Sequence, residues 1–213
     1  MNYLQSLPKS KKDEEEKVSL TSSRVEMEDP TDSMEDTQDP WRIFRIMTEF
    51  VMGFDFLKQY TKAATVFGSA RFKQNHPSYK EAEKLARLLS KEGFAIMTGG
   101  GPGIMEAANR GAHKAGGHSV GLSIKIPTEQ GTNQYVNKFT EYKYFFTRKV
   151  MLVYASQLYV FFPGGFGTLD ELFELVTLVK THKIQPVPMI LVDKKFWTPL
   201  LKWIDETLVK QYN

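Results

Sequence analysis

The chain has 213 residues, of which 41% are hydrophobic and 25% charged, and it contains no cysteine. This composition is ordinary for a soluble globular protein, and the absence of cysteine excludes disulfides, thiolate metal sites and a cysteine nucleophile. The start of the chain lacks the apolar core of a signal peptide, and no apolar stretch approaches the roughly 18 residues of a membrane span. We therefore expect a cytoplasmic protein with no membrane partner.

Charge is divided unevenly along the chain. Residues 1–40 hold 5 basic and 11 acidic side chains, although the whole chain has a net charge of +3. Residues 1–39 are predicted to form a disordered acidic tail, because so polar a segment cannot bury enough apolar surface to offset its ordering entropy. The basic remainder suits an anionic ligand, but it carries no signature of a nucleic-acid-binding module, so nucleic acid is not an expected partner.

Regular structure is predicted to begin where the tail ends. From Trp41 to Leu57, apolar residues recur mostly at three- and four-residue steps, which indicates a helix that covers an edge or a face of the remaining domain. Strands and helices then alternate. Strands are predicted at residues 64–70, 94–99, 118–124, 138–143, 157–162 and 187–193, and helices at residues 77–93, 102–117, 144–156, 168–183 and 196–212.

This alternation defines the expected fold class. Strands that read as unbroken apolar runs between helices are typical of a parallel sheet covered on both faces. We predict one α/β domain over residues 40–213: a doubly wound, mostly parallel, Rossmann-like sheet with helices on both faces, plus an N-terminal helix. In such a sheet, ligands bind beyond the carboxyl ends of the strands, near the point where the strand order reverses.

Three predicted strand ends carry unusual residues. They are "FGSAR" (residues 67–71), "TGGGPGIMEAANRG" (residues 98–111) and "PGGFGTLDE" (residues 163–171). A glycine-rich turn that enters a helix offers backbone N–H groups beside the positive end of the helix dipole, which is a site for phosphate. Tight helix–strand packing explains one such turn equally well, and neither turn matches a standard dinucleotide or P-loop motif. Two such turns at neighbouring strand ends favour the anion site.

Charged residues near these turns are the candidates for chemistry. Glu171 lies about one turn into the predicted helix that follows "PGGFGT", where an acid commonly favours the helix dipole. Arg148 and Lys149 interrupt a heavily apolar helix, and although such residues usually extend to the surface, we expect at least one of the pair to point into the cleft. Glu106 is a further candidate for the cleft. The histidines lack metal-ligand spacing, so no metal site is predicted.

Together these motifs resemble the Lonely Guy (LOG) phosphoribohydrolase family, once described as lysine-decarboxylase-like. "PGGFGTLDE" matches its PGGxGTxxE signature, "GGGPGIMEAANRGA" its second glycine motif, and "FFTRK" its Arg-Lys pair. The resemblance runs from about Trp41 to the C-terminus, and the leading "RIMTEFVMGFDFL" looks like the bacterial subgroup with an N-terminal helical extension. One departure is Asp170, which stands where many members have glutamate.

The resemblance implies hydrolysis of the N-glycosidic bond of a nucleoside 5′-monophosphate, either AMP or a cytokinin riboside 5′-monophosphate, to the free base and ribose 5-phosphate. It implies Arg148 and Glu171 as the catalytic pair, no cofactor, and a homodimer or larger assembly. The other residues that the motifs assign to substrate binding are Ser69, Gly99, Gly100, Gly101, Gly103, Met105, Lys149, Pro163, Gly164, Gly165, Gly167 and Thr168.

The chemistry of bond cleavage agrees with this assignment. Cleavage of an N-ribosyl bond builds oxocarbenium-like charge on the sugar, which a carboxylate such as Glu171 would stabilise. A lysine decarboxylase would need a lysine for a pyridoxal phosphate Schiff base and a partner for the ring nitrogen, and no motif supplies that pair. The alternative is a nucleotide-binding or sensing protein without turnover, which would use the same glycine loops. The sequence leaves base preference open.

Overall fold

The computed structural model describes residues 41–125 and 131–212, so the predicted tail lies outside the described residues. Six strands form one sheet in the order β4-β3-β2-β1-β5-β6, and every neighbouring pair is parallel. This arrangement confirms the predicted doubly wound α/β fold. The strands are β1 (Ala63–Phe67), β2 (Ala95–Thr98), β3 (Ser119–Ile124), β4 (Lys138–Tyr142), β5 (Leu158–Phe161) and β6 (Met189–Leu191).

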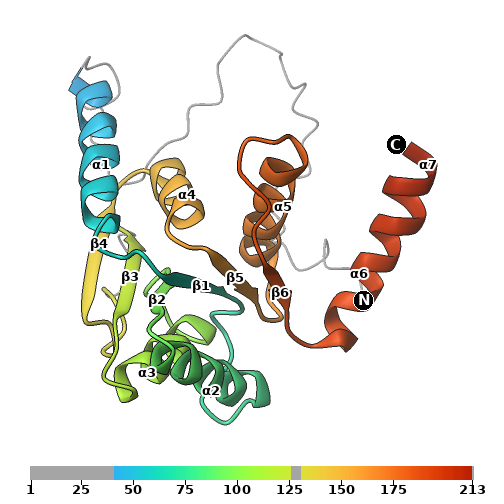
Figure 1. Ribbon diagram of the computed structural model, residues 1–213, viewed down its shortest axis with the longest axis horizontal. Coiled ribbons are helices and arrows are strands. Elements are labelled where there is room, and N and C mark those ends of the chain that lie inside the picture. The colour runs from blue at the N-terminus through green and yellow to red at the C-terminus, as the bar shows by residue number, and fades with distance from the viewer. Residues whose placement is uncertain (1–40, 126–130, 213) are drawn as a thin grey trace, which may run out of the picture.

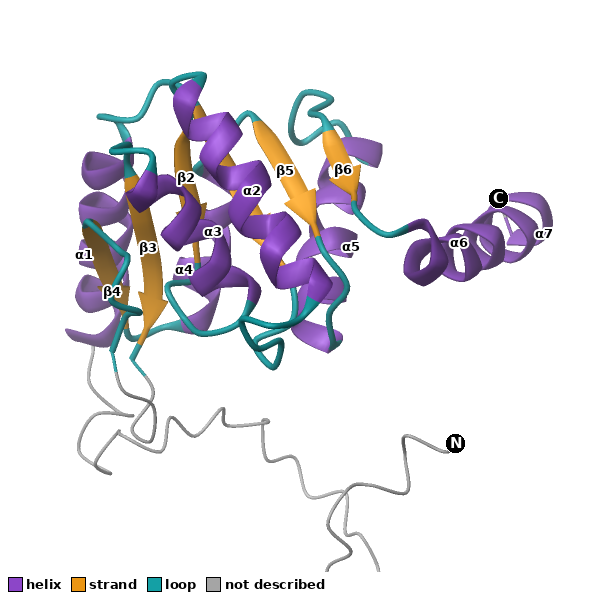
Figure 2. Ribbon diagram, turned by 90° about the horizontal axis from the view of Figure 1, so that it is seen from below, coloured by secondary structure: helices purple, strands orange, loops and turns teal. Residues whose placement is uncertain are grey.

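Helices cover both faces of the sheet (Figures 1 and 2). On one face lie α2 (Pro77–Lys91) and α3 (Ile104–Lys114), and on the other lie α1 (Trp41–Leu57), α4 (Phe145–Tyr154) and α5 (Phe166–Lys180). The chain ends in α6 (Lys194–Trp203), a π-helical stretch η3 (Ile204–Val209) and α7 (Lys210–Tyr212), which extend away from the sheet (Figure 2).

Side-chain alternation along the strands divides the core into two parts. In β1, Ala63 and Phe67 pack on the side of α1, α4 and α5, whereas Ala64 and Val66 pack on the side of α2 and α3. The strand as a whole is buried, as a central parallel strand covered by helices must be. The alternation therefore explains why the strands read as continuous apolar runs rather than as alternating ones.

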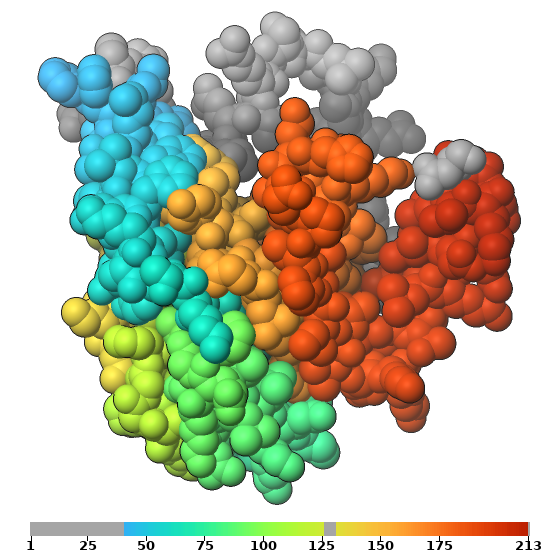
Figure 3. Space-filling model, viewed as in Figure 1, coloured from blue at the N-terminus to red at the C-terminus, as the bar shows by residue number. Residues whose placement is uncertain are grey.

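The predicted leading helix forms α1, and it packs beside α4 and against the edge strand β4 (Figures 1 and 3). Two helix starts differ from their predictions. Helix α3 begins at Ile104 rather than at the predicted Pro102, and α5 begins at Phe166 rather than at the predicted Thr168. Among the described residues, no helix is both long and apolar enough to cross a membrane. The cytoplasmic location stays a prediction.

Candidate active site

A cavity of about 600 Å³ lies at the carboxyl ends of β1, β2 and β5. In the sheet, β1 lies between β2 and β5. Strands β2 to β4 follow on one side of β1 and strands β5 and β6 on the other, so the strand order reverses at this point. Such a switch point is where ligands bind in open α/β sheets. Of the residues predicted from the sequence, the cavity wall contains Ser69, Gly99, Met105, Arg148, Pro163, Gly164, Gly165, Gly167, Thr168 and Glu171.

The turn after β1 joins the two glycine-rich loops. The Ser69 amide donates a hydrogen bond to the Pro163 carbonyl at 3.0 Å, and the Ser69 carbonyl accepts one from the Ile104 amide, also at 3.0 Å. The Ser69 hydroxyl accepts a bond from the Arg71 amide at 3.1 Å and so closes the turn. Ser69 thus holds the start of α3 and the end of β5 at fixed distances from each other.

The PGGFGT loop (residues 163–168) places the first turn of α5 at the cavity. Gly165 precedes the first residue of the helix, and its carbonyl accepts from the Thr168 amide at 3.0 Å. A Cβ atom on Gly165 or Gly167 would meet no neighbouring described atom within 4 Å, whereas one on Gly164 would collide with the Thr168 side chain. Open space beside helix-start amides is the geometry of an anion site.

Glu171 lies in the second turn of α5, so it is not the first-turn acid that favours the helix dipole. It lines the cavity but is only 6% exposed, and among the described residues its Oε2 atom has no hydrogen-bond partner. Burial raises the pKa of Glu171 to about 7, against the opposing effect of Lys149 and Arg148. A carboxyl group with a pKa near neutrality can gain or lose a proton at working pH.

Arg148 reaches the cavity from α4. Its Nε atom donates to the Leu122 carbonyl of β3 at 2.8 Å, and its guanidinium lies 5.9 Å from the Phe145 ring centroid. A Cβ atom on Gly99 would collide with the Arg148 Nη2 atom. Arg148 is therefore held between β3 and the GGGPG loop, and its positive charge lowers the pKa of Glu171.

The GGGPG loop (residues 99–103) also lines a second cavity of about 510 Å³, which shares Gly99, Met105 and Arg148 with the main cavity. The wall of this second cavity includes Gly100, Gly101, Ser123, Lys125 and Glu141. Hydrogen bonds with neighbouring side chains fix the conformation of the GGGPG loop. The Thr98 hydroxyl accepts from the Gly100 amide at 2.9 Å and donates to Asn109 Oδ1 at 2.7 Å. The Asn133 amide group donates to the Gly100 and Gly101 carbonyls at 3.0 and 3.1 Å.

Two predicted binding residues lie outside both cavity walls. Gly103 precedes α3 with φ of 72°, and a Cβ atom there would lie 2.7 Å from the Ala70 Cα atom, so this glycine serves backbone packing. Lys149 turns away toward α5, where its Nζ atom pairs with Asp170 and, at 3.0 Å, with Glu174. Burial lowers the pKa of Lys149, but these two carboxylates raise it above its usual value.

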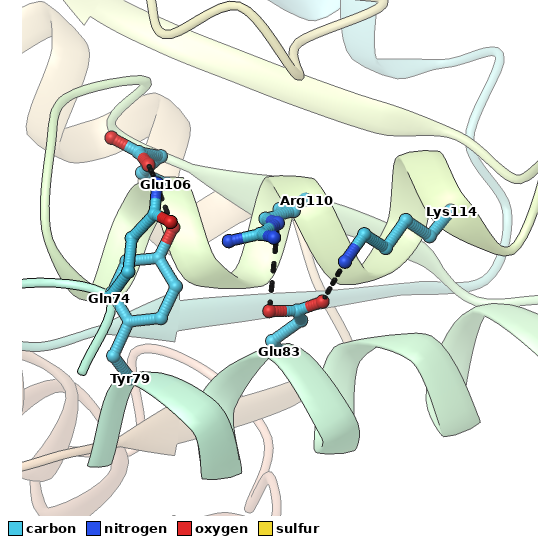
Figure 4. A network of polar contacts seen from close by, with 6 residues as sticks. All are labelled: Gln74, Tyr79, Glu83, Glu106, Arg110 and Lys114. Atoms are coloured by element: carbon cyan, nitrogen blue, oxygen red, sulfur yellow. Dashed lines mark hydrogen bonds and ion pairs between the residues drawn. The ribbon is translucent and has the colours of Figure 1, made fainter. Parts of the chain in front are cut away.

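Glu106, the further candidate for the cleft, does not line either cavity. Its Oε1 atom accepts hydrogen bonds from the Tyr79 hydroxyl at 2.7 Å and from Gln74 at 3.3 Å, between α2 and α3 (Figure 4). Farther along the same helix pair, Glu83 binds Arg110 and Lys114. The interpretation of Glu106 as a cleft residue was wrong, because its position on α3 faces the neighbouring helix.

Other cavity residues were missed by sequence reasoning. Phe145 and Leu152 lie three residues before and four residues after Arg148, so they share its face of α4, and this helical spacing could have identified them. Phe196 comes from α6, and nothing in the sequence predicts its approach. Asn109 and Asn133 also escaped notice, because their role in holding the GGGPG loop depends on contacts between distant segments.

Within residues 41–125 and 131–212, no three metal-binding side chains come together. The fold and the cavity define a doubly wound α/β protein with an open, glycine-rich helix start and a buried carboxyl group at its switch point. A family model described as "Possible lysine decarboxylase" matches residues 105–212, and the chain belongs to this family. The described wall of the main cavity contains no lysine, so a pyridoxal phosphate Schiff base does not fit there.

Curated relatives carry the LOG name that the motifs suggested. The chain is 29% identical over 152 residues to the cytokinin riboside 5′-monophosphate phosphoribohydrolase LOG of Oryza sativa subsp. japonica, with 69% of this chain and 61% of the relative covered. It is 30% identical over 139 residues to the probable phosphoribohydrolase LOG6 of Arabidopsis thaliana, with 63% and 68% covered. The chain thus spans about three fifths of the rice relative's length.

Among solved structures, the molybdenum cofactor binding protein from Rippkaea orientalis, a phototrophic bacterium, is similar with a TM-score of 0.51 and 25% identity. The match covers 68% of this chain and 85% of that one. A structural genomics target matches with the same TM-score at 20% identity, over 68% of this chain and all of its own. These likenesses agree with the doubly wound fold.

Proposed function

We propose that the protein hydrolyses the N-glycosidic bond of a nucleoside 5′-monophosphate to a free base and ribose 5-phosphate. The observation that carries the proposal is Glu171, a buried carboxyl group with a pKa of about 7 in the wall of a cavity that also holds Arg148 and an open helix start. The family's phosphoribohydrolase relatives support the same reaction class. AMP and cytokinin riboside 5′-monophosphates are the proposed substrates.

Substrate binding would begin at the phosphate. The amides of Gly165 and Gly167 lie at the start of α5, where the helix dipole favours an anion and no Cβ atom on these two residues blocks the approach, and the Thr168 hydroxyl is a further donor. Arg148, which lines the same cavity, would contact the ribose or the phosphate with its guanidinium. Binding energy from this non-reacting end would place the sugar against Glu171.

The reaction would then proceed at the sugar C1′ atom. As the bond from C1′ to the base nitrogen breaks, its electron pair passes to the base, which takes up a proton, and the sugar acquires oxocarbenium-like charge. The Glu171 carboxylate would stabilise that charge and accept a proton from the water whose oxygen bonds to C1′. The balanced products are the free base and ribose 5-phosphate.

A chromatographic assay of purified protein with AMP tests this proposal, because free adenine and ribose 5-phosphate must appear in equal amounts. A screen of other nucleoside monophosphates would establish base preference. The second candidate is a binding protein without turnover, which the similarity to a molybdenum cofactor binding protein favours. A protein that binds AMP but releases no adenine would establish that alternative and end the hydrolase proposal.

A symmetric homodimer is also part of the proposal. Large apolar side chains remain exposed on α1 and α4, and Phe54 and Tyr154 join the two helices with their ring centroids 4.8 Å apart. A second copy of the chain would cover this face, as the family resemblance implies. Phe145 is both exposed and part of the cavity wall, so the interface would border the site. Light scattering at micromolar concentration should give the mass of a dimer, and a monomer would contradict it.

A further inference from the structure

Helix α1 lies unusually close to the elements that support the cavity. A Cβ atom on Gly53 would lie 2.5 Å from the Met151 Sδ atom of α4 and 2.9 Å from the Tyr142 hydroxyl oxygen of β4. The glycine therefore lets the α1 backbone pack directly against α4. One turn earlier on the same face of α1 is Glu49, which is half-buried, so it also faces α4.

Glu49 accepts hydrogen bonds from the two backbone amides that precede α4 and from one side chain of its first turn. Its Oε1 atom accepts from the Lys143 amide at 2.6 Å, and its Oε2 atom accepts from the Tyr144 amide at 3.4 Å and from the Thr147 hydroxyl. The residue in the capping position, Tyr144, makes no side-chain capping bond of its own. A carboxylate at a helix start both caps free amides and interacts favourably with the dipole.

The turn that Glu49 holds leads directly to the cavity. Thr147, which bonds Glu49, immediately precedes Arg148, and the Arg148 amide donates to the Tyr144 carbonyl at 3.3 Å. The Arg148 Nε atom in turn donates to the Leu122 carbonyl of β3, so this bond joins the first turn of α4 to the sheet. A displacement of that turn would carry Arg148 away from β3.

We infer that Glu49 is a positioning residue, which acts on a bound ligand through Arg148. The leading helix then belongs to the support of the site and does more than cover apolar surface. Side chains that hold a ligand-binding group need such support, since small displacements of that group reduce both affinity and rate. The effect on turnover rests on the proposed hydrolase function, but the effect on Arg148 itself does not.

The direct test is the NMR signal of the Arg148 Nε–H group in the ligand-free protein, assigned by its loss in Arg148→Lys. Glu49→Ala should shift or broaden this signal and speed its exchange with water. Glu49→Gln should restore it in part, because the amide oxygen can still accept from Lys143 and the amide nitrogen can donate to the Thr147 hydroxyl, whereas the Tyr144 amide loses its acceptor. An unchanged signal in Glu49→Ala would overturn the inference, whether or not the protein hydrolyses AMP.

Two control variants separate positioning from stability. Asp55→Asn removes a carboxylate from the exposed face of the same helix, and Leu57→Ala removes buried apolar surface from its last residue. Asp55→Asn should change nothing, and Leu57→Ala should lower the melting temperature without moving the Arg148 signal. If Leu57→Ala moves that signal as far as Glu49→Ala does, Glu49 has only a general structural role.

Ligand binding supplies an independent measurement. Glu49→Ala should weaken AMP affinity and lower kcat/KM about tenfold in the folded protein, and combining it with Arg148→Ala should add nothing to the loss from Arg148→Ala alone. A fully additive double variant would contradict action through Arg148. Should Glu49→Ala fail to fold, Thr147→Val removes the hydroxyl that donates to Glu49 and to the Tyr144 carbonyl, and it should shift the Arg148 signal in the same direction.

Discussion

The GGGPG and PGGFGT loops both follow a parallel strand and enter a helix beside the same cavity, yet the surroundings of their glycines differ. In the GGGPG loop, a Cβ atom on Gly99 would collide with Arg148, and one on Gly103 would collide with the turn after β1. In the PGGFGT loop, Cβ atoms on Gly165 and Gly167 would enter open space. Packing therefore explains Gly99 and Gly103, whereas Gly165 and Gly167 leave room that a ligand can use.

This difference distinguishes two structural reasons for the same glycine-rich sequence pattern. A glycine-rich turn between a strand and a helix is required either by close packing within the protein or by the close approach of a ligand. The carboxyl group with the raised pKa also lies on the helix of the PGGFGT loop, not on α3. We therefore expect substitutions at Gly165 and Gly167 to impair function, and a substitution at Gly103 to impair stability first.

The largest effect is expected from Glu171→Gln. This change keeps the size of the side chain but removes the charge that would stabilise an oxocarbenium-like sugar, so turnover of AMP should fall roughly 10²-fold or more with affinity largely retained. Adenine release and AMP binding are measured side by side. Glu174→Gln, one turn along the same helix, is the matched control and should stay active, because Glu174 pairs with Lys149 outside the cavity. Normal turnover by Glu171→Gln would show that the Glu171 carboxylate does not take part in the reaction.

The next effect is expected from Gly167→Val. A branched side chain would fill the open space at the start of α5, so AMP affinity should fall roughly tenfold to a hundredfold, in line with the loss of one or two hydrogen bonds to a charged group. The melting temperature should stay close to that of the wild type, because no described neighbour lies within 4 Å of the added Cβ atom. Unchanged affinity in a folded variant would show that the open space does not receive the ligand.

Gly103→Ala should show the opposite pattern. The new Cβ atom would force an unfavourable backbone at φ of 72° and would press on the backbone of Ser69 and Ala70. The expected loss is about 3 kcal/mol of unfolding free energy, from backbone strain and overpacking together. Chemical denaturation measures it, and AMP affinity of the folded fraction should change less than in Gly167→Val. A variant of wild-type stability would contradict the packing explanation.

The fold could be predicted from the sequence because each strand is an apolar run and each helix has its own periodicity, both of which are local signals. The PGGFGT loop, Arg148 and Glu171 were likewise accessible, through motif resemblance and the chemistry of an acid near a helix start. Lys149 and Glu106 could not be placed, since each has partners on a different helix, and those contacts depend on the relative rotation of the helices. The contact between Glu49 and α4 joins residues 94 to 98 positions apart and left no pattern in the sequence.

The smallest predicted effect is a pH dependence of the unfolding free energy, which we expect to come from Glu171 on the helix that follows the PGGFGT loop. The pKa of Glu171 rises from 4.5 to about 7 on folding, so between these values the folded protein binds more protons than the unfolded chain. This carboxyl group therefore contributes stability below about pH 4.5 that is lost as the pH rises through 7.

Glu171→Gln should match the wild type at pH 4.5 and exceed its unfolding free energy by about 1–2 kcal/mol at pH 8, somewhat less than the full shift because the buried amide also lacks partners. Denaturant titrations at pH 4.5, 6 and 8 measure the difference, with Gly103→Ala as the comparison whose deficit should not vary with pH. An advantage of Glu171→Gln that is equal at all three pH values would show that the wild-type carboxyl group does not titrate near neutrality.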